Sequence, residues 1–241
     1  MKTPNIVAHR GLHDEYPENS LKALLAAWDA GIEWCECDVR GSLEHEPFLF
    51  HDETLDRMTD GSGLISRTPA EVLHRASLRA ADGSLTSLCV PRLRSVIASM
   101  PSGAKLLVEI KPNVNRETIR RTVELCDADR CIIQSFNQNV LDEAEEFAPD
   151  IPLVLLDEDV PFPRVEEFEK ERWDLLSWSA INVQHERLTA ESVARIRRIG
   201  LAVGAWTVNA DEEIRRMIAL GVDTIISDRP LRVRDICREI G

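Results

Sequence analysis

Short β-rich runs alternate with helical patterns along the whole chain, and this alternation restricts the fold more than any other feature. The helical patterns place apolar residues three and four positions apart, as at Leu21, Leu24, Leu25 and Trp28. Repeated strand–helix units predict a parallel sheet, either closed into a barrel or open with helices on both faces. The candidate strands are residues 5–9, 34–39, 106–111, 131–136, 152–156, 175–179 (or 175–183), 201–206 and 224–227.

Start and stop signals support the predicted helices. Asn19 or Ser20 can cap the helix over residues 21–28, and Gly31 can end it. Gly221 follows a second pattern at residues 214–218. Further helical patterns cover residues 119–126, 140–147 and 193–199, with weaker ones at 93–100 and 165–173.

Chain length and the first turn favour the closed barrel. With 241 residues the chain is close to the size of a minimal (β/α)8 barrel. A doubly wound nucleotide-binding sheet needs a Gly-rich turn after its first strand, and the sequence His9-Arg10-Gly11-Leu12 is not such a turn. We therefore predict one domain, residues 1–241, folded as an α/β (β/α)8 TIM barrel. Residues 40–90 are read as an insertion after the second strand, with an extra strand-like piece at 47–51.

Composition and charge set the class of partner. The hydrophobic fraction of 44% and charged fraction of 29% are typical of a soluble globular protein, and no apolar run reaches the ~18 residues of a membrane span. Without a signal-peptide pattern, and with six cysteines mostly in apolar segments, we expect a cytoplasmic protein with free thiols. The net charge of −13 argues against nucleic acid as a partner. It also means that any site for a phosphate ester must concentrate positive charge locally.

Polar residues gather at the predicted carboxyl ends of the strands, where catalytic groups lie in (β/α)8 barrels. Glu36 and Asp38 are two positions apart on one strand, so their carboxylates face the same side, and Glu109 and Lys111 repeat this spacing. The candidate site residues are His9, Arg10, Glu36, Asp38, His51, Glu109, Lys111 and Trp206.

These residue types suit phosphate chemistry. The three carboxylates are hard oxygen ligands for one divalent cation, Mg²⁺ or Ca²⁺. Arg10 and Lys111 can bind phosphate oxygens, and His9 and His51 can move protons near neutral pH. Simpler explanations remain for single residues: a structural histidine, a salt-bridge network, or, for Asp52, a turn cap. Several ionisable groups inside apolar strands would be costly to bury without a shared purpose, however.

Several motifs occur in a fixed order from residue 6 to about residue 230, and this ordered set resembles the glycerophosphodiester phosphodiesterase family. The matching residues are His9-Arg10-Gly11, Pro17-Glu18-Asn19-Ser20, Glu36-Cys37-Asp38, the run from His51 to Gly63, Glu109-Ile110-Lys111, Trp206-Thr207-Val208-Asn209, and Gly221-Val222-Asp223 followed by Ser227-Asp228-Arg229-Pro230. The Pro17–Ser20 motif precedes an amphipathic helix, so helix capping is the interpretation we prefer for it.

The resemblance implies a barrel with an insertion after strand two and a metal-dependent phosphodiesterase that releases glycerol 3-phosphate and an alcohol. It also implies roles: Glu36, Asp38 and Glu109 hold the metal, His9 and His51 form the acid–base pair, Arg10 and Lys111 bind phosphate, and Trp206 faces the glycerol or the leaving group, unless it is simply a core aromatic.

Two alternatives stay open. One is a lysophospholipase D-like enzyme for larger lipid diesters, which exposed apolar residues at 64–90 would support. The other is a non-catalytic phosphate-binding protein. Residues 64–90 match no family motif, and Pro91-Arg92-Leu93-Arg94-Ser95 departs from the family's P-x-L-E-E stretch. The sequence does not determine the leaving group or the choice between Mg²⁺ and Ca²⁺. It also leaves open whether water or a glycerol hydroxyl attacks, which histidine is the acid and which the base, and the oligomeric state.

Overall fold

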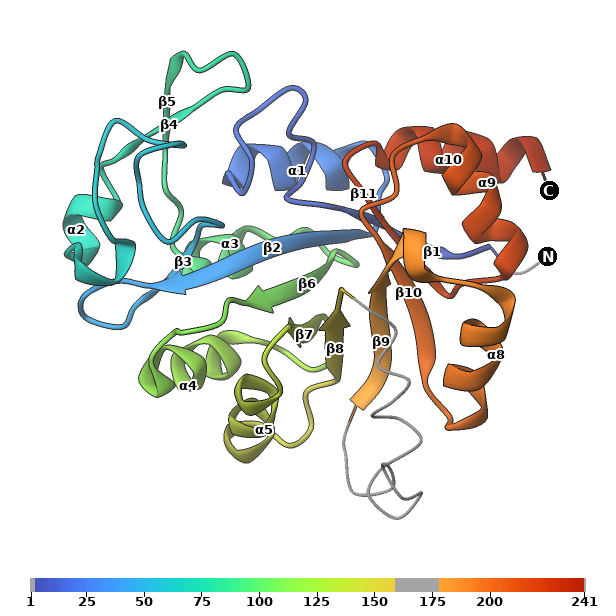
Figure 1. The fold of residues 1–241 in the computed structure, drawn as a ribbon. Helices are drawn as coiled ribbons and strands as arrows, with labels where there is room; N and C mark the ends of the chain where they lie inside the picture. Colours follow the sequence, from blue (N-terminus) through green and yellow to red (C-terminus); the bar gives the residue numbers. More distant parts are fainter. Residues whose placement is uncertain (1–2, 159–177, 241) are drawn as a thin grey trace.

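Eight parallel strands close into a barrel in the computed structural model of the protein, which describes residues 3–158 and 178–240 (Figure 1). Hydrogen bonding runs in the order β1-β11-β10-β9-β8-β7-β6-β2, and pairing of β1 with β2 completes the ring. The predicted (β/α)8 TIM barrel is therefore confirmed. The barrel strands are β1 (Asn5–Ala8), β2 (Trp34–Gly41), β6 (Lys105–Ile110), β7 (Cys131–Ser135), β8 (Leu153–Asp157), β9 (Trp178–Gln184), β10 (Ala202–Trp206) and β11 (Thr224–Ser227).

Helices pack outside the strands, and most of them lie where the apolar spacing predicts. They are α1 (Leu21–Asp29), α3 (Leu93–Ser99), α4 (Arg116–Leu125), α5 (Gln138–Phe147), α8 (Ala190–Arg198), α9 (Asp211–Leu220) and α10 (Pro230–Ile240). The helix α10 was not predicted, and the predicted helix at residues 165–173 lies outside the described residues, as does the start of the predicted strand at 175. None of the helices in the described part of the chain has the length and apolarity of a membrane span.

Local signals explain where two of these helices begin and end. The Ser20 side chain accepts a hydrogen bond from the Ala23 amide and caps α1. Gly221 follows α9 with φ of 72°, a left-handed conformation that glycine adopts without a side-chain clash. Both positions agree with the sequence prediction.

The segment after β2 forms a small unit with its own core. Strand β3 (Pro47–Leu49) pairs antiparallel with β2, and β4 (Ser77–Arg79) pairs with β5 (Leu85–Cys89) in a separate two-stranded sheet. A short helix α2 (Ala70–Leu73) and a 3₁₀ turn (Ile65–Arg67) complete it. Its core is separate from the main core and contains Phe48, Phe50, Leu55, Met58, Ile65, Ala70, Leu73, Ala76, Leu78 and Val90. The insertion thus holds residue 51 on a packed support.

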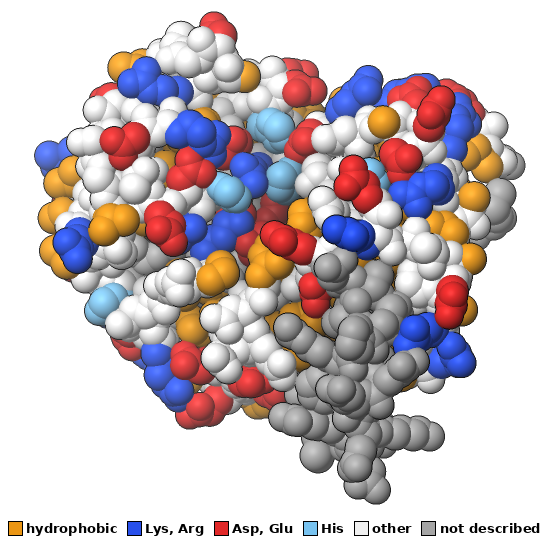
Figure 2. All heavy atoms as spheres, viewed as in Figure 1, with side chains coloured by type: hydrophobic (Ala, Val, Ile, Leu, Met, Phe, Trp, Pro, Cys, Tyr) orange, Lys and Arg blue, Asp and Glu red, His pale blue; other side chains and the backbone are white. Residues whose placement is uncertain are grey.

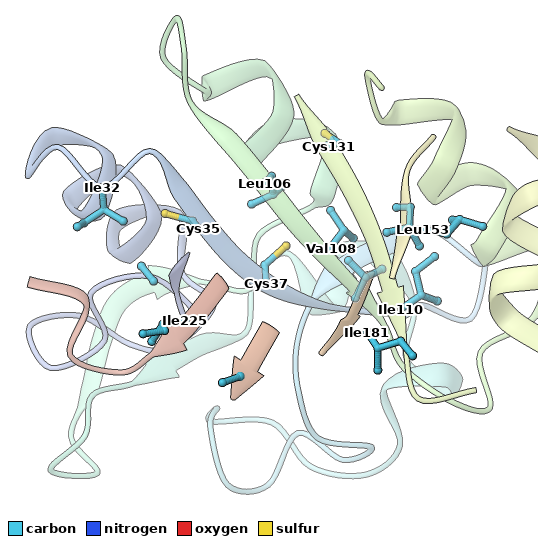
Figure 3. Close-up of a cluster of buried hydrophobic side chains, with 14 of the residues drawn as sticks. Ile32, Cys35, Cys37, Leu106, Val108, Ile110, Cys131, Leu153, Ile181 and Ile225 are labelled. Carbon is cyan, nitrogen blue, oxygen red and sulfur yellow. The ribbon is translucent and has the colours of Figure 1, made fainter. Parts of the chain in front are cut away.

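Strand alternation sorts the barrel side chains into two sets. Cys35 and Cys37 of β2 pack among apolar residues of neighbouring strands such as Leu106 and Val108, in the core between barrel and helices (Figure 3). The intervening Glu36 must then face the barrel interior. All six cysteines are free thiols, and burial raises the pKa of Cys35 and Cys37. The prediction of structural thiols is correct for these two.

Candidate active site

The strand ends bring the predicted site residues together at one end of the barrel. A cavity of about 270 Å³ is lined by seven of the eight, and the eighth, Asp38, contacts two of these seven. On the face in Figure 2, histidine and Lys or Arg side chains gather near the centre with acidic side chains beside them. The cavity lining comprises His9, Arg10, Glu36, His51, Glu109, Lys111, Gln134, Phe136, Leu156, Glu158, Trp206, Thr207 and Ile226.

The three carboxylates form a buried cluster. Glu36, Asp38 and Glu109 each offer an oxygen within 4.8 Å of the others, and Glu36 Oε1 is buried with no hydrogen-bond partner. Burial, followed by the nearby charges of Asp38 and Glu109, raises the pKa of Glu36 well above its usual value. Burial likewise raises the pKa of Glu109 to about 7. An all-oxygen donor set with an unpartnered buried oxygen fits a hard divalent cation such as Mg²⁺ or Ca²⁺.

The two predicted phosphate-binding cations lie directly against this cluster. Arg10 Nε is 3.0 Å from Asp38 Oδ2, and Lys111 Nζ is 2.6 Å from Asp38 Oδ1 and 2.5 Å from Glu109 Oε1. Burial alone would raise the pKa of Asp38, but Lys111 and Arg10 outweigh it and hold that pKa below its usual value. The three carboxylates and the side chains of Arg10 and Lys111 carry a net charge of −1 when all are ionised. A bound divalent metal ion would change this net charge to +1. That reversal meets the local requirement set by an acidic chain and an anionic substrate.

Each predicted catalytic histidine is held by a carboxylate through the same ring nitrogen. His9 Nδ1 lies 2.6 Å from Asp228 Oδ1, and His51 Nδ1 lies 2.7 Å from Asp52 Oδ1. An ionised carboxylate only accepts hydrogen bonds, so Nδ1 carries the proton in both rings. The Nε2 atoms are then free for substrate, and His9 Nε2 lies 3.9 Å from Glu36 Oε2. Burial, the largest influence, lowers the pKa of His51, although the Asp38 charge opposes the change.

Asp228 is a site residue to which the sequence assigned no role. Its Oδ1 also accepts from His13 Nε2 at 2.9 Å, while its Oδ2 accepts from Asn209 Nδ2 at 2.6 Å. Asn209 is itself fixed, because its Oδ1 accepts from the Asp228 amide and from the Ser227 hydroxyl. Burial would raise the pKa of Asp228, but the hydrogen bonds from His13 and His9 hold it far below its usual value. The Ser227-Asp228-Arg229-Pro230 motif was the available signal, but only barrel closure places it beside His9.

Helix capping accounts for only part of the Pro17–Ser20 motif. The buried Asn19 donates from Nδ2 to Asp38 Oδ2 at 2.7 Å, and its Oδ1 accepts from the Asp38 amide at 3.0 Å. Glu18 pairs with Arg10 and also with Arg57. The capping interpretation is right for Ser20 but wrong for Glu18 and Asn19, which hold the site together. Their adjacency to a cap concealed this role.

Asp52 also does more than cap a turn. Its carboxylate joins His51 to Arg57, with Arg57 Nε 2.6 Å from Asp52 Oδ2. Burial would raise the pKa of Asp52, but the hydrogen bonds from Arg57 and His51 lower it to about 2. The carboxylate that orients His51 is therefore itself fixed by a cation.

Two aromatic residues, Trp206 and Phe136, also line the cavity. The ring of Trp206 meets Phe136 edge to face at 5.4 Å, and its Nε1 donates to the Asn182 carbonyl at 3.1 Å. Of the two polar residues at the end of β7, Gln134 lines the cavity, whereas the Ser135 hydroxyl is buried and donates to the Ile110 carbonyl. Ser135 is therefore structural.

Comparisons with known proteins agree with this architecture. The model of the Glycerophosphoryl diester phosphodiesterase family matches residues 9–232. A glycerophosphodiester phosphodiesterase of Caldanaerobacter subterraneus subsp. tengcongensis is 28% identical over 247 residues, with 98% of each chain covered. A glycerophosphodiester phosphodiesterase of Bacillus altitudinis is 28% identical over 250 residues, again with 98% of each chain covered. A phosphodiesterase of Oleispira antarctica, solved in complex with the product sn-glycerol-3-phosphate, is 27% identical with a TM-score of 0.86 and covers 98% of this chain and 97% of its own.

Fold, site and similarity define the class of the protein: it is a phosphoric diester hydrolase built on a (β/α)8 barrel. Because the family model spans nearly the whole chain, the chain belongs to the glycerophosphodiester phosphodiesterase family. The alternative of a non-catalytic phosphate-binding protein is not supported.

Proposed function

We propose that the protein hydrolyses glycerophosphodiesters to an alcohol and glycerol 3-phosphate in a reaction that depends on Mg²⁺ or Ca²⁺. The observation that carries the proposal is one cavity that joins a buried three-carboxylate cluster to two carboxylate-held histidines. The names of the relatives, and the glycerol 3-phosphate bound to the Oleispira phosphodiesterase, support this substrate class.

Each predicted residue has a role in this proposal. Glu36, Asp38 and Glu109 would hold the cation, which supplies Lewis-acid stabilisation of charge on a phosphoryl oxygen when it is bound. Arg10 and Lys111 bind the non-bridging phosphate oxygens and stabilise the charge that develops on them. Trp206 and Phe136 provide an apolar wall for the carbon skeleton of the glycerol.

His9 and His51 act as the proton-transfer pair. One Nε2 accepts a proton from the attacking oxygen, water or the neighbouring glycerol hydroxyl, as a new P–O bond forms. The other Nε2 donates a proton to the alcohol oxygen as its P–O bond breaks. Asp228 and Asp52 keep Nδ1 protonated, so that Nε2 faces the substrate in both rings. When the glycerol hydroxyl attacks, water opens the cyclic phosphate in a second step.

Two broader properties complete the proposal. We propose that residues 1–241 form one domain, with the insertion at about 40–90 packed on the barrel. We also propose a cytoplasmic location, which the six free thiols support because disulfides are rare in reducing compartments.

A larger lipid diester is a second candidate substrate, in the manner of a lysophospholipase D. The large apolar side chains that are most exposed among the described residues all lie in the insertion: Leu43, Leu64, Val72 and Leu85. Exposed apolar side chains on the insertion suit contact with an acyl chain.

The deciding experiment measures glycerol 3-phosphate release from glycerophosphocholine by purified protein, with EDTA and then with Mg²⁺ or Ca²⁺ restored. We expect release that stops with EDTA and returns with one of the ions. Release of choline from lysophosphatidylcholine, with none from glycerophosphocholine, would favour the lipid diester. No turnover of either substrate with any ion would refute the proposed function.

A further inference from the structure

A second cavity adjoins the candidate active site, and the proposed catalytic roles leave it unused. Its volume is about 500 Å³, and its lining includes Arg40, Ser42, Glu53, Ser66 and Asn113. We call it the Arg40 pocket. It lies between the end of β2, the insertion and the start of α4.

The Arg40 pocket meets the candidate active site at His51. Arg40 Nε donates to the His51 carbonyl at 2.7 Å, so the guanidinium touches the backbone of a predicted catalytic residue. Glu53 follows His51 by two positions, and Asn113 follows Lys111 by two. The Arg40 pocket and the candidate active site are therefore neighbours on the two sides of His51.

Arg40 differs from Arg10 and Arg57, the two arginines paired with site carboxylates, because it lacks a carboxylate partner. Arg10, Arg57 and Arg92 each pair with two carboxylates. Among the described residues, Arg40 has no carboxylate within 4.0 Å, and its two Nη groups have no hydrogen-bond acceptor. A half-buried guanidinium that lines a cavity, and whose Nη groups have no acceptor among the described residues, is suited to bind a planar or tetrahedral oxyanion in a fork.

We propose that the Arg40 pocket is the subsite for the leaving alcohol, and that it selects alcohols carrying an oxyanion, a carboxylate or a phosphate. The inference rests on the proposed phosphodiesterase function. In phosphoryl transfer the attacking and leaving oxygens lie on opposite sides of phosphorus. With the glycerol against Trp206 and the phosphate between Arg10 and Lys111, the leaving alcohol points past His51 towards Arg40.

A second charged residue in the pocket narrows the chemical class of the expected ligand. Glu53 is exposed and is the one carboxylate among the lining residues. A zwitterionic alcohol can place its carboxylate on Arg40 and its ammonium group towards Glu53. The serine headgroup has this chemistry, whereas ethanolamine has the same skeleton without the carboxylate. These two headgroups therefore form a matched pair of probes.

The test compares kcat/KM for glycerophosphoserine and glycerophosphoethanolamine in the wild-type metal-loaded enzyme and in Arg40→Met and Arg40→Lys variants. We expect the wild type to prefer the serine diester by about tenfold or more, as expected for a charge-assisted contact. Arg40→Met should bring the ratio close to one, and Arg40→Lys should retain part of it. Arg67→Met, which removes a positive charge from an exposed neighbour of the pocket, is the matched control and should keep the wild-type ratio.

The ratio of the two kcat/KM values distinguishes a loss of substrate selection from a general loss of activity. Loss of the Arg40–His51 hydrogen bond would slow both substrates equally and leave their ratio unchanged. Equal turnover of the two diesters by the wild type, or an unchanged ratio in Arg40→Met, would overturn the inference while leaving the phosphodiesterase proposal intact. Absence of turnover for both diesters and for glycerophosphocholine would instead remove the function on which the inference rests.

Discussion

Replacing Asp228 with asparagine tests whether the carboxylate sets the protonation of His9. Asn209 Nδ2 donates to Asp228 Oδ2 at 2.6 Å, so the new amide must place its oxygen there. Its NH₂ group then takes the position of Oδ1, 2.6 Å from His9 Nδ1. His9 must accept at Nδ1 and carry its proton on Nε2, which is the opposite tautomer.

Partial exposure of His9 and Asp228 limits the loss of kcat/KM expected for Asp228→Asn. A misplaced tautomer in a catalytic histidine costs up to about 10⁴ in rate in a serine protease, where the aspartate is buried. Here the side chains of His9 and Asp228 are 19% and 27% exposed, so water can compensate for part of the loss. We therefore expect Asp228→Asn to lower kcat/KM by about 10³, which corresponds to about 4 kcal/mol.

The assay is metal-saturated turnover of glycerophosphocholine, with Asn209→Ala and the double variant as controls. Asn209→Ala removes the group that fixes the new amide, so the amide can rotate and present its oxygen to His9. The double variant should therefore recover about tenfold over Asp228→Asn alone, a coupling of about 1.4 kcal/mol. Activity of Asp228→Asn within tenfold of wild type would refute the tautomer argument, and so would a double variant no faster than the single one.

Three further outcomes are expected. Glu36→Gln should weaken Mg²⁺ or Ca²⁺ binding by at least about tenfold in a calorimetric titration, because it removes one of the charged oxygens proposed as ligands; unchanged affinity would place the ion elsewhere. Gly11→Ala should destabilise the fold by about 3 kcal/mol in urea unfolding, because φ is +81° and a Cβ atom would lie 2.5 Å from the Ala23 backbone; a loss below about 1 kcal/mol would contradict this. Because Arg57 and His51 lower the pKa of Asp52 to about 2, its stabilising effect is present above its unfolded pKa and is lost as pH falls through about 2. The stability difference between wild type and Asp52→Asn should therefore shrink as pH falls from about 4 to 2, and a difference that grows over this range would reverse the assigned sign.

The features predicted from the sequence are those that depend on periodicity. A two-residue spacing placed Glu36 and Asp38 on one face because strand geometry is local. Glu109 and Lys111 followed the same rule, although Lys111 lies just beyond the end of β6. The closed barrel followed from the number of strand–helix units and the chain length, which do not depend on individual contacts.

The features that were missed depend on contacts between distant segments. Asn19 and Asp38 are 19 positions apart, and His9 and Asp228 are 219 apart. No periodic pattern links such pairs, and each missed residue has a plausible local role as a helix cap or turn. The Arg40 pocket was missed for a related reason, since an arginine without a partner is recognisable only when all its neighbours are placed.

The two histidines reach the cavity by different structural routes, and this difference shows how the site is assembled. His9 meets Asp228 because β1 pairs with β11, with the His9 amide bonded to the Ser227 carbonyl at 3.0 Å. Its orientation therefore depends on closure of the barrel by the last strand. His51 meets the adjacent Asp52 on a segment supported by the separate core of the insertion. Proton transfer needs both Nε2 atoms at one phosphate, so the barrel and the insertion must hold a fixed relation. The Arg40 hydrogen bond to the His51 carbonyl, which runs from a barrel strand to the insertion, contributes to that relation and places the proposed leaving-group subsite at the same junction.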